Sequence, residues 1–331
     1  MASFSRPNLS FIAIGLLAPP FFLATAGQAG PPGADPGASL SAAERDVLRH
    51  MSIVYLDDGQ GGVTKTVQFR RCNVQIVNGS GSTDGEPDGL GNLIVGYNEA
   101  REYGSDQRTG SHNIIGGREN NYTRFGGLVL GERNSITGDW SSISAGSWGL
   151  ASGEFSSISG GTRGWASGRY SSISGGYGNK AFGRSSSVTG GALSTADERA
   201  SSISGGLSNF AAGPMSSISG GAFNIAKGYA GAVSGGELNY AIGTYSSVSG
   251  GGGNTATGFE SSISGGSFNV ASASYSSVSG GRINTASRTC ASVSGGYNNL
   301  ANGRYSSVSG GQNRSAPSVF DWAAGTLLED L

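Results

Sequence analysis

Hydrophobic positions recur with one fixed period over most of the chain. An element close to Ser-Ser-x-Ser-Gly-Gly begins at residue 141, again at 156 and 171, and so on to 306, in twelve copies without insertion or deletion. Its third position is always isoleucine or valine, and alanine always follows eight residues later, from Ala151 to Ala316. The β-branched positions are Ile143, Ile158, Ile173, Val188, Ile203, Ile218, Val233, Val248, Ile263, Val278, Val293 and Val308. A lone β-branched residue between polar neighbours predicts a short strand that buries one side chain.

The rest of the repeat predicts a second short strand and two turns. Glycine stands three residues after every β-branched position, and asparagine stands six residues after it in eight copies. A helical repeat would not tolerate about three glycines in each copy. In the copy that begins at residue 171, Ile173 should point inward between the outward Ser172 and Ser174. In the following strand, Asn179 and Ala181 should share a face.

Identical copies can stack about 4.7–4.9 Å apart, which gives a rod about 60 Å long for the twelve regular coils. The predicted fold is therefore all-β, a parallel β-solenoid (β-roll) with 15-residue coils. Ile and Val should form a thin apolar ladder, and the asparagines can form an amide ladder. Each coil buries little apolar area against the entropy lost on ordering it, so association with other copies is expected to add stability.

The repeat becomes less regular toward the N-terminus. Two further coils are indicated, one in register at Leu128, Gly131, Asn134, Ile136 and Gly138, and one shifted by a residue at Ile114, Gly117 and Asn120. Residues 92–98 indicate the first coil, and residues 99–111 indicate an insertion that should bulge out as a loop. The solenoid is therefore expected to span residues 92–316.

The segments on either side of the solenoid should cap its two ends. Residues 43–50 predict a short helix, and residues 52–69 predict a hairpin whose turn is Asp-Asp-Gly-Gln-Gly-Gly. Residues 30–91 are expected to form a linker and an N-terminal cap that protects the first edge of the sheet. Residues 317–331 are expected to form a C-terminal cap that includes Phe320, Trp322, Leu327 and Leu328.

The segment 1–29 resembles a secretory signal peptide. Arg6 precedes an apolar run, and small residues follow it, with candidate cleavage after Ala26 or Ala29. A membrane anchor is the competing interpretation, but Pro19 and Pro20 divide a run that is already short for a membrane span. No later segment is apolar enough to cross a bilayer. The expected location is therefore secreted, either extracellular or on the outer cell surface.

Composition excludes some classes of function and leaves others open. The chain has 60 glycines among 331 residues, and its 21 basic and 22 acidic residues leave a formal net charge of −1. Its basic residues are scattered, so nucleic-acid binding is not expected. Cys72 and Cys290 should lie at opposite ends of the rod. Two free thiols are therefore expected, with an intermolecular disulfide as the alternative.

Candidate chemistry is sparse. His50 and His112 are the only histidines, and neither lies in a recognisable catalytic or metal-binding motif, so we expect no enzyme activity and no cofactor. Asp84, Glu86 and Asp88 alternate as in a calcium loop, but the twelfth position, Val95, is not a glutamate. We interpret these three residues as a solvated turn and keep them as a weak metal candidate.

Six coils carry an aromatic residue just before the repeated element: Trp140, Phe155, Tyr170, Tyr245, Tyr275 and Tyr305. Because they occur at one phase of the repeat, they should form a stripe along one edge of the rod. The stripe could shield the turn, pack against a neighbouring chain, or bind glycans or proteins. The regular serines could also form an ice-binding face, which usually carries threonine instead.

The repeat resembles the head repeats of trimeric autotransporter adhesins of the YadA-like type. The shared features are the β-branched position, the glycine at Gly146 to Gly311, the alanine ladder and a later glycine. The later glycines are Gly153, Gly168, Gly183, Gly213, Gly228, Gly243, Gly258 and Gly303. The resemblance covers about residues 92–316, without the family's stalk and membrane anchor. It implies a bacterial, left-handed β-roll in which three chains pack side by side and the surface binds matrix proteins or cells.

These observations predict a non-enzymatic protein of adhesion or recognition, which binds by many equivalent contacts along a stiff rod. Its expected partners are further copies of the chain, as a suspected trimer, and a protein or glycan of a host or cell surface. A purely structural surface or filament component is the main alternative. Ice binding and catalysis are less favoured.

Overall fold

The computed structural model describes residues 40–325. The predicted signal peptide and two residues of the predicted C-terminal cap, Leu327 and Leu328, lie outside this range. The described residues fall into two compact units, residues 40–74 and residues 75–325. Within residues 40–325, no helix is both long and apolar enough to span a membrane.

The first unit contains the predicted helix and hairpin. Helix α1, Ala42–Arg49, begins with a capping box in which the Ser41 hydroxyl accepts from the Glu44 backbone N–H and the Glu44 carboxylate accepts from the Ser41 backbone N–H. Strands β1, Met51–Asp57, and β2, Val63–Phe69, pair antiparallel. The prediction of these elements is confirmed. Their role as a cap remains a prediction.

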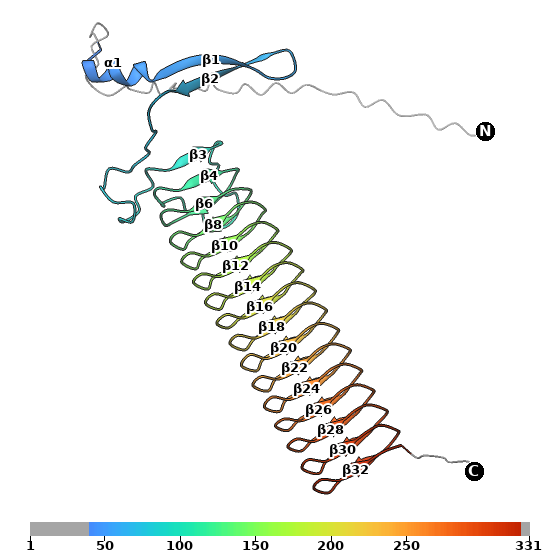
Figure 1. The fold of residues 1–331 in the computed structure, drawn as a ribbon. Helices are drawn as coiled ribbons and strands as arrows, with labels where there is room; N and C mark the ends of the chain where they lie inside the picture. Colours follow the sequence, from blue (N-terminus) through green and yellow to red (C-terminus); the bar gives the residue numbers. More distant parts are fainter. Residues whose placement is uncertain (1–39, 326–331) are drawn as a thin grey trace, which may run out of the picture. The chain divides into compact units, whose positions relative to one another are not determined.

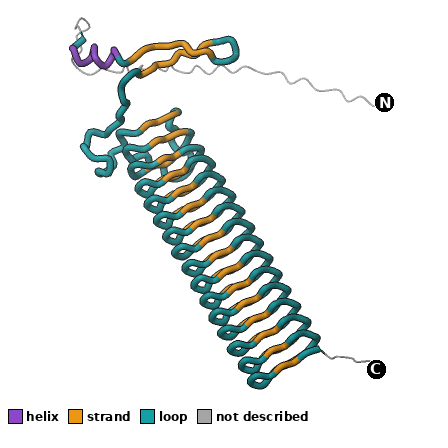
Figure 2. The backbone as a smooth tube through the Cα atoms, in the orientation of Figure 1, coloured by secondary structure: helices purple, strands orange, loops and turns teal. Residues whose placement is uncertain are grey.

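The second unit is a parallel β-solenoid, as predicted (Figures 1 and 2). Its first sheet has 16 strands and its second has 14. The first sheet contains β3 (Leu93–Val95), β4 (Ile114–Gly116), β6 (Leu128–Val129), β8 (Ser142–Ile143), β10 (Ser157–Ile158), β12 (Ser172–Ile173), β14 (Ser187–Val188), β16 (Ser202–Ile203), β18 (Ser217–Ile218), β20 (Ala232–Val233), β22 (Ser247–Val248), β24 (Ser262–Ile263), β26 (Ser277–Val278), β28 (Ser292–Val293), β30 (Ser307–Val308) and β32 (Trp322–Ala323). The second contains β5 (Asn121–Tyr122), β7 (Ser135–Ile136), β9 (Leu150–Ala151), β11 (Trp165–Ala166), β13 (Lys180–Ala181), β15 (Thr195–Ala196), β17 (Phe210–Ala211), β19 (Ile225–Ala226), β21 (Tyr240–Ala241), β23 (Thr255–Ala256), β25 (Val270–Ala271), β27 (Thr285–Ala286), β29 (Leu300–Ala301) and β31 (Ser315–Ala316).

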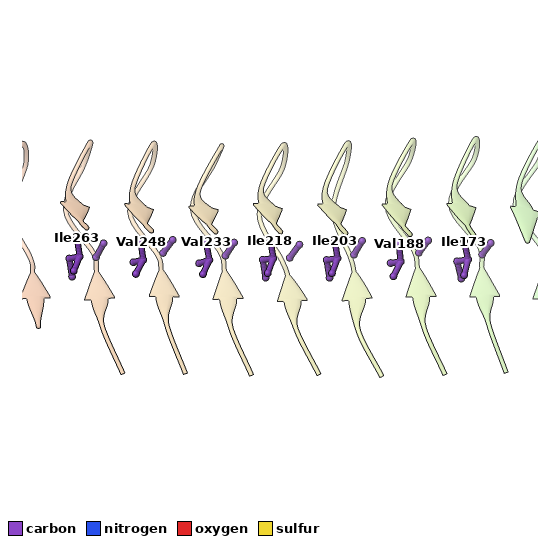
Figure 3. Packing of buried hydrophobic residues seen from close by; sticks show 14 of the residues in the cluster. Ile173, Val188, Ile203, Ile218, Val233, Val248 and Ile263 are labelled. Atoms are coloured by element: carbon purple, nitrogen blue, oxygen red, sulfur yellow. The ribbon is translucent and has the colours of Figure 1, made fainter. Parts of the chain in front are cut away.

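The core is narrow and lies between the two sheets. It consists of one column of isoleucine and valine side chains from the first sheet and one column of alanine side chains from the second. Each β-branched residue of the twelve regular coils is at most 2% exposed, and the alanines that face them are fully buried. Figure 3 shows Ile173, Val188 and Ile203 stacked in the first of these columns. Equivalent residues pair in register, as Ile173 does with Val188. The predicted inward and outward alternation is confirmed.

The asparagine ladder forms, but by amide-to-backbone contacts instead of amide-to-amide contacts. The Nδ2 of Asn239 donates to the carbonyl oxygens of Gly235, 2.9 Å away, and of Gly251, 3.0 Å away in the next coil. Its Oδ1 accepts from the backbone N–H of Asn254. The Gly251 carbonyl also accepts from the Glu237 backbone N–H, so the asparagine adds a second bond there and supplies the acceptor for the Asn254 N–H.

The two glycines of the repeated Gly-Gly pair have different roles. Gly176 has a φ of +91°, and a Cβ added there would lie 2.1 Å from the carbonyl oxygen of Gly191. A Cβ at Gly175 would meet no atom within 4 Å. Only the second glycine of the pair is therefore required by the close approach of successive coils.

Backbone hydrogen bonds join successive coils in both directions. The N–H of Ser142 donates to the carbonyl oxygen of Ser156, 2.9 Å away in the following coil, and the N–H of Leu150 donates to that of Gly164. Two turn residues per coil donate in the opposite direction, as the N–H of Tyr170 does to the carbonyl of Glu154. The parallel pairing of Ile158 with Ile143 likewise makes the Ile158 N–H a donor to the preceding coil.

The coils at the N-terminal end differ from the prediction in register. Ile115 pairs with Val129, and Val129 with Ile143, so each of these coils is one residue shorter than a regular coil. Ile115 and Val129 are buried, whereas Ile114 is 48% exposed and Leu128 is partly exposed. The predicted core positions Ile114 and Leu128 were therefore wrong by one residue. The turn between Val129 and Glu132 is one residue shorter than the turn in the later coils.

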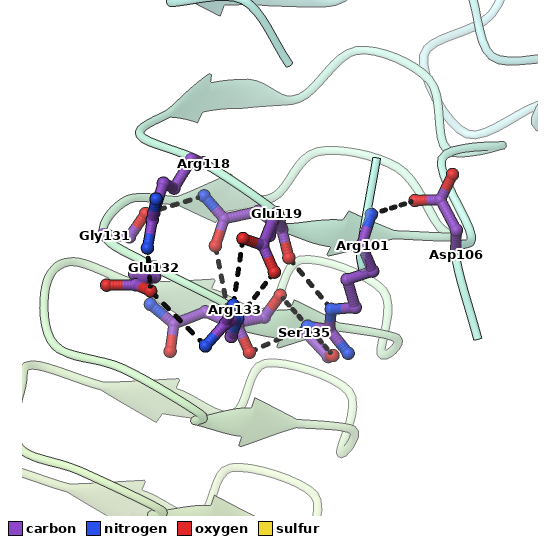
Figure 4. A network of polar contacts seen from close by, with 10 residues as sticks. Arg101, Asp106, Arg118, Glu119, Gly131, Glu132, Arg133 and Ser135 are labelled. Atoms are coloured by element: carbon purple, nitrogen blue, oxygen red, sulfur yellow. Dashed lines mark hydrogen bonds and ion pairs between the residues drawn. The ribbon is translucent and has the colours of Figure 1, made fainter. Parts of the chain in front are cut away.

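The insertion at residues 99–111 does not bulge freely. Arg101 donates to the carbonyl oxygens of Glu119, Arg133 and Asn134 at 2.8–2.9 Å (Figure 4). The backbone of residues 107–110 pairs with Tyr122, next to the first strand of the second sheet. The insertion is fastened across two coils because the Arg101 guanidinium reaches carbonyl groups in both.

The solenoid also extends further toward the C-terminus than residue 316. Trp322 pairs with Ser307, and Ala323 pairs with Val308, so residues 317–325 form part of another coil. The indole N–H of Trp322 donates to the Ser309 hydroxyl at 2.8 Å. The described part of the expected C-terminal cap therefore continues the repeat.

Candidate binding surface

The six aromatic residues singled out in the sequence share one turn and one backbone conformation. Their φ angles lie between 57° and 61°, and their side chains are 41–51% exposed. Each backbone N–H is held by a carbonyl of the preceding coil, as Tyr170 is by Glu154 at 3.0 Å. A positive φ is uncommon for bulky residues, and here the stacked coils impose it. We call these six residues, with the rings that contact them, the aromatic row.

Ring contacts extend the aromatic row beyond the six residues. Phe155 and Tyr170 stack with centroids 5.2 Å apart and planes 7° apart. Tyr305 stacks on Phe320 in the same way. A second group of rings comes from two adjacent positions of the turn. Tyr245 and Tyr275 hold the position of the six residues, and Tyr229 and Phe259 stand one residue earlier. Neighbouring ring centroids in this group are 5.5–6.0 Å apart. Phe125 meets Trp140 edge to face.

The sequence analysis missed Phe125, Tyr229, Phe259 and Phe320 as members of the row. Tyr229 and Phe259 stand one residue earlier in the repeat than the six predicted residues, and Phe320 continues the same phase. A search of each coil for aromatic residues within one position of this turn residue would have found Tyr229 and Phe259. The row is interrupted at Ser185, Ala200, Met215 and Cys290, which occupy the same turn position.

Charged groups flank the rings. The Arg169 guanidinium lies 4.9 Å from the Tyr170 ring centroid and forms an ion pair with Glu154, with Nε and Oε2 2.9 Å apart. Arg304 lies similarly over Tyr305. Because neighbouring rings cover part of one another's faces, a partner would meet mainly ring edges together with these donors. Such a surface combines apolar contact with hydrogen bonding.

A second row of exposed apolar residues lies on the other turn of the coil, between the first and second strands. It was not predicted. These residues also have positive φ, between 55° and 59°, and are 37–59% exposed: Trp148, Leu193, Phe223, Leu238, Phe268 and Ile283. Each stands five residues after the buried β-branched position, and that fixed offset was the available signal.

The outer faces of the two sheets differ in chemistry. The first sheet presents serines, such as the partly exposed Ser172 and the exposed Ser174. The second presents larger side chains, which include the exposed Trp165 and Phe210. Ice binding by the serine face stays a less favoured prediction.

The acidic residues near the N-terminal coils make local contacts. Asp88 accepts hydrogen bonds from the Leu90 backbone N–H and the Ser111 hydroxyl, and these bonds lower the pKa of its carboxyl. Asp84 accepts from the Ser82 hydroxyl, which lowers the pKa of Asp84. In residues 40–325, no cluster of three or more His, Cys, Asp or Glu could hold a metal ion. The structure thus does not gather Asp84, Glu86 and Asp88 into a site.

Both histidines contact backbone groups. The Nδ1 of His50 lies 2.8 Å from the carbonyl oxygen of Arg70 and ties α1 to the base of the hairpin. His112 accepts from the Asn78 backbone N–H at Nε2, and its Nδ1 lies 3.0 Å from the Thr83 carbonyl oxygen. These contacts place His112 at the edge of a cavity of about 330 Å³, lined mainly by residues 75–83.

Both cysteines are free in the structure, in agreement with the sequence analysis. Cys72 is exposed in the first unit. Cys290 is partly exposed and occupies the turn position of the aromatic row, with a φ of 56°.

Comparison with known proteins leaves the fold as the main guide to function. No protein-family description matches the sequence, and no curated protein matches it significantly. The resemblance to YadA-like heads therefore rests on the coil pattern and on the parallel β-solenoid itself.

Proposed function

We propose that the protein acts in adhesion or surface recognition outside the cell and binds its partner through the aromatic row. One observation carries this proposal. The same turn of six coils holds half-exposed aromatic side chains in one fixed backbone conformation. Aromatic residues provide large contact areas with little loss of side-chain entropy on binding.

Repetition makes weak contacts sufficient. Each coil repeats the geometry of its neighbour, so a partner with repeated groups can engage several coils at once. Linked contacts of this kind can raise overall affinity about 10²–10⁴-fold over a single contact. The partner class that fits is a surface protein or glycan with repeated apolar and hydrogen-bonding groups.

Two further parts of the proposal come from the sequence. The N-terminal segment supports export of the protein by a signal peptide. The resemblance to YadA-like heads supports a homo-oligomer of three chains, which would multiply the number of contacts again.

A structural filament is the alternative function, and the in-register stacking of identical coils favours it. The two functions differ in the assemblies that they produce. A filament component forms extended end-to-end assemblies visible by electron microscopy, whereas an adhesin remains a particle of defined mass.

Binding to a panel of immobilised matrix proteins and glycans tests the adhesion proposal. The variant Tyr245→Ser with Tyr275→Ser removes two rings, and serine already occupies this turn position at Ser185. We expect at least tenfold weaker binding than that of the unsubstituted protein. The control is Phe268→Ser, which removes from the other turn a ring that is 59% exposed, against 50% for Tyr245 and 51% for Tyr275. Equal binding by all three proteins would contradict a role for the aromatic row.

A further inference from the structure

The hairpin β1–β2 exposes its apolar face. Paired residues share a face, and the pairs Met51 with Phe69, Ile53 with Val67, Tyr55 with Lys65 and Asp57 with Val63 lie on the same one. Five apolar side chains on this face are 50–66% exposed: Ile53, Tyr55, Val63, Val67 and Phe69. We call these five residues the hairpin apolar face.

The opposite face of the hairpin is more polar and better covered. It carries Ser52, Val54, Leu56, Thr64, Thr66 and Gln68. Among them, Ser52, Val54 and Thr66 are partly buried. The hydrophobic effect predicts the reverse arrangement, with the apolar face covered and the polar face in water. The exposed apolar face therefore requires a partner.

The first unit also has no core of its own. None of residues 40–74 is buried, and α1 buries no side chain. A two-stranded hairpin is at best marginally stable in water. Folded units of fewer than about 40 residues usually depend on a disulfide, a metal or oligomerisation. Cys72 is the only cysteine of the first unit, and its described residues contain no metal-binding cluster. Of these three means, oligomerisation is the one that the described residues leave open.

We propose that the hairpin apolar face is a self-association surface that packs against the same face of a second copy of the chain. The charged residues on this face are Asp57 and Lys65, so the central pair Ile53 and Val67 is free of charge. Interface centres are depleted of charge in the same way. At about 100 Å² for each of five half-exposed side chains, the contact buries about 500 Å² per copy, at the low end for specific interfaces.

This inference goes beyond the proposed adhesive function and does not depend on it. It assigns the contact between copies to the first unit, whereas ligand binding is assigned to the aromatic row of the second. The two assignments can therefore fail separately.

Light scattering of the purified full-length chain after size-exclusion chromatography tests the inference. We expect the unsubstituted protein to have a multiple of the mass of one chain, and Ile53→Lys to have the mass of a single chain. Leu56→Lys is the matched control, because Leu56 lies in the same strand, is 51% exposed against 56% for Ile53, and faces the other way. It should keep the mass of the unsubstituted protein, as should the conservative variant Ile53→Val.

Three outcomes would overturn the inference. A single-chain mass for the unsubstituted protein would mean that a segment of the same chain covers the hairpin apolar face. An unchanged mass for Ile53→Lys would place the contact between copies elsewhere, for example on the solenoid. Equal dissociation of Leu56→Lys and Ile53→Lys would show that self-association depends on the folded hairpin as a whole and not on this face. The aromatic-row variant Tyr245→Ser with Tyr275→Ser should keep its mass in every case.

Discussion

The side-chain oxygen of Asn239 accepts a hydrogen bond from the backbone N–H of Asn254, 3.1 Å away in the next coil. The same asparagine donates to two glycine carbonyls, one in its own coil and one in the next. Asn239 is fully buried, so its amide group cannot form these hydrogen bonds with water instead. One side chain thus completes the backbone hydrogen bonding of two adjacent coils.

Removal of this side chain should destabilise the solenoid. Asn239→Ala leaves the Asn254 N–H and the glycine carbonyls without this partner, and buried groups without partners cost about 1–3 kcal/mol each. We expect a loss of about 3 kcal/mol in the free energy of unfolding. Asn239→Ser should lose less, because Ser194 occupies the same position in another coil and accepts from the Asn209 N–H. Chemical denaturation of the two variants would show equal losses if the amide contacts were unimportant.

The two glycines of one turn should respond differently to alanine. Gly176→Ala places a Cβ 2.1 Å from the carbonyl oxygen of Gly191 at a positive φ, and we expect a loss of about 2–4 kcal/mol. Gly175→Ala meets no atom within 4 Å and should change stability by less than about 1 kcal/mol. Thermal unfolding of both variants checks the difference. Similar melting temperatures for the two would refute the steric explanation.

A glycine at the turn of the aromatic row should stabilise the protein where no ring is lost. Ala200 is exposed and has a φ of 55°. Glycine avoids the cost of about 1–2 kcal/mol of this conformation but gains more freedom in the unfolded chain. We therefore expect Ala200→Gly to raise the free energy of unfolding by about 0.5–1 kcal/mol. A decrease in the melting temperature would indicate that the turn relaxes in solution.

Acid should weaken the coils at the N-terminal end. Two hydrogen bonds from Arg133 to the Glu119 carboxylate, at 2.6 and 3.1 Å, lower the pKa of Glu119. A carboxyl whose pKa is lower in the folded state stabilises the protein above its unfolded pKa of about 4.3. This contribution is lost as the pH falls through the lower folded-state pKa.

Glu119→Gln should therefore be less stable than the unsubstituted protein at pH 7, and the difference should shrink as the pH falls toward 3. Thermal unfolding across this range measures it. Glu237→Gln serves as the control, since no ion pair is found for Glu237 within residues 40–325. A gap between Glu119→Gln and the unsubstituted protein that stays constant with pH would exclude the ion pair as its cause.

The regular coils could be predicted from the sequence because one slot of the repeat accepts only β-branched residues. Isoleucine or valine at Ile143 to Val308 fixes both the buried face and the register, since a shift by one residue would bury serine instead. Near the N-terminus this constraint fails. Leu128 and Val129 are adjacent and both apolar, so the pattern alone does not show which is buried. In the structure Val129 is the buried residue, because the turn that follows it is one residue shorter than the turn in the regular coils.

The candidate surface was only partly predictable for a different reason. A positive φ can be inferred from glycine, but the turns of both apolar rows hold residues such as Tyr170 and Ile283, whose type does not reveal the backbone conformation. The docking of the insertion through Arg101 depends on carbonyl groups in two coils. Every residue has a backbone carbonyl, so the sequence does not show which carbonyls accept these bonds. Side-chain periodicity therefore predicted the core better than the turns.

The parallel register gives the solenoid a direction. Each coil pairs with the next through parallel strands, as Ile173 does with Val188. A second rod that continues both sheets with its core residues facing inward keeps this parallel pairing only when it is joined head to tail, because two like ends would meet with their strands antiparallel. Any filament that extends the two sheets of this chain therefore has a single polarity.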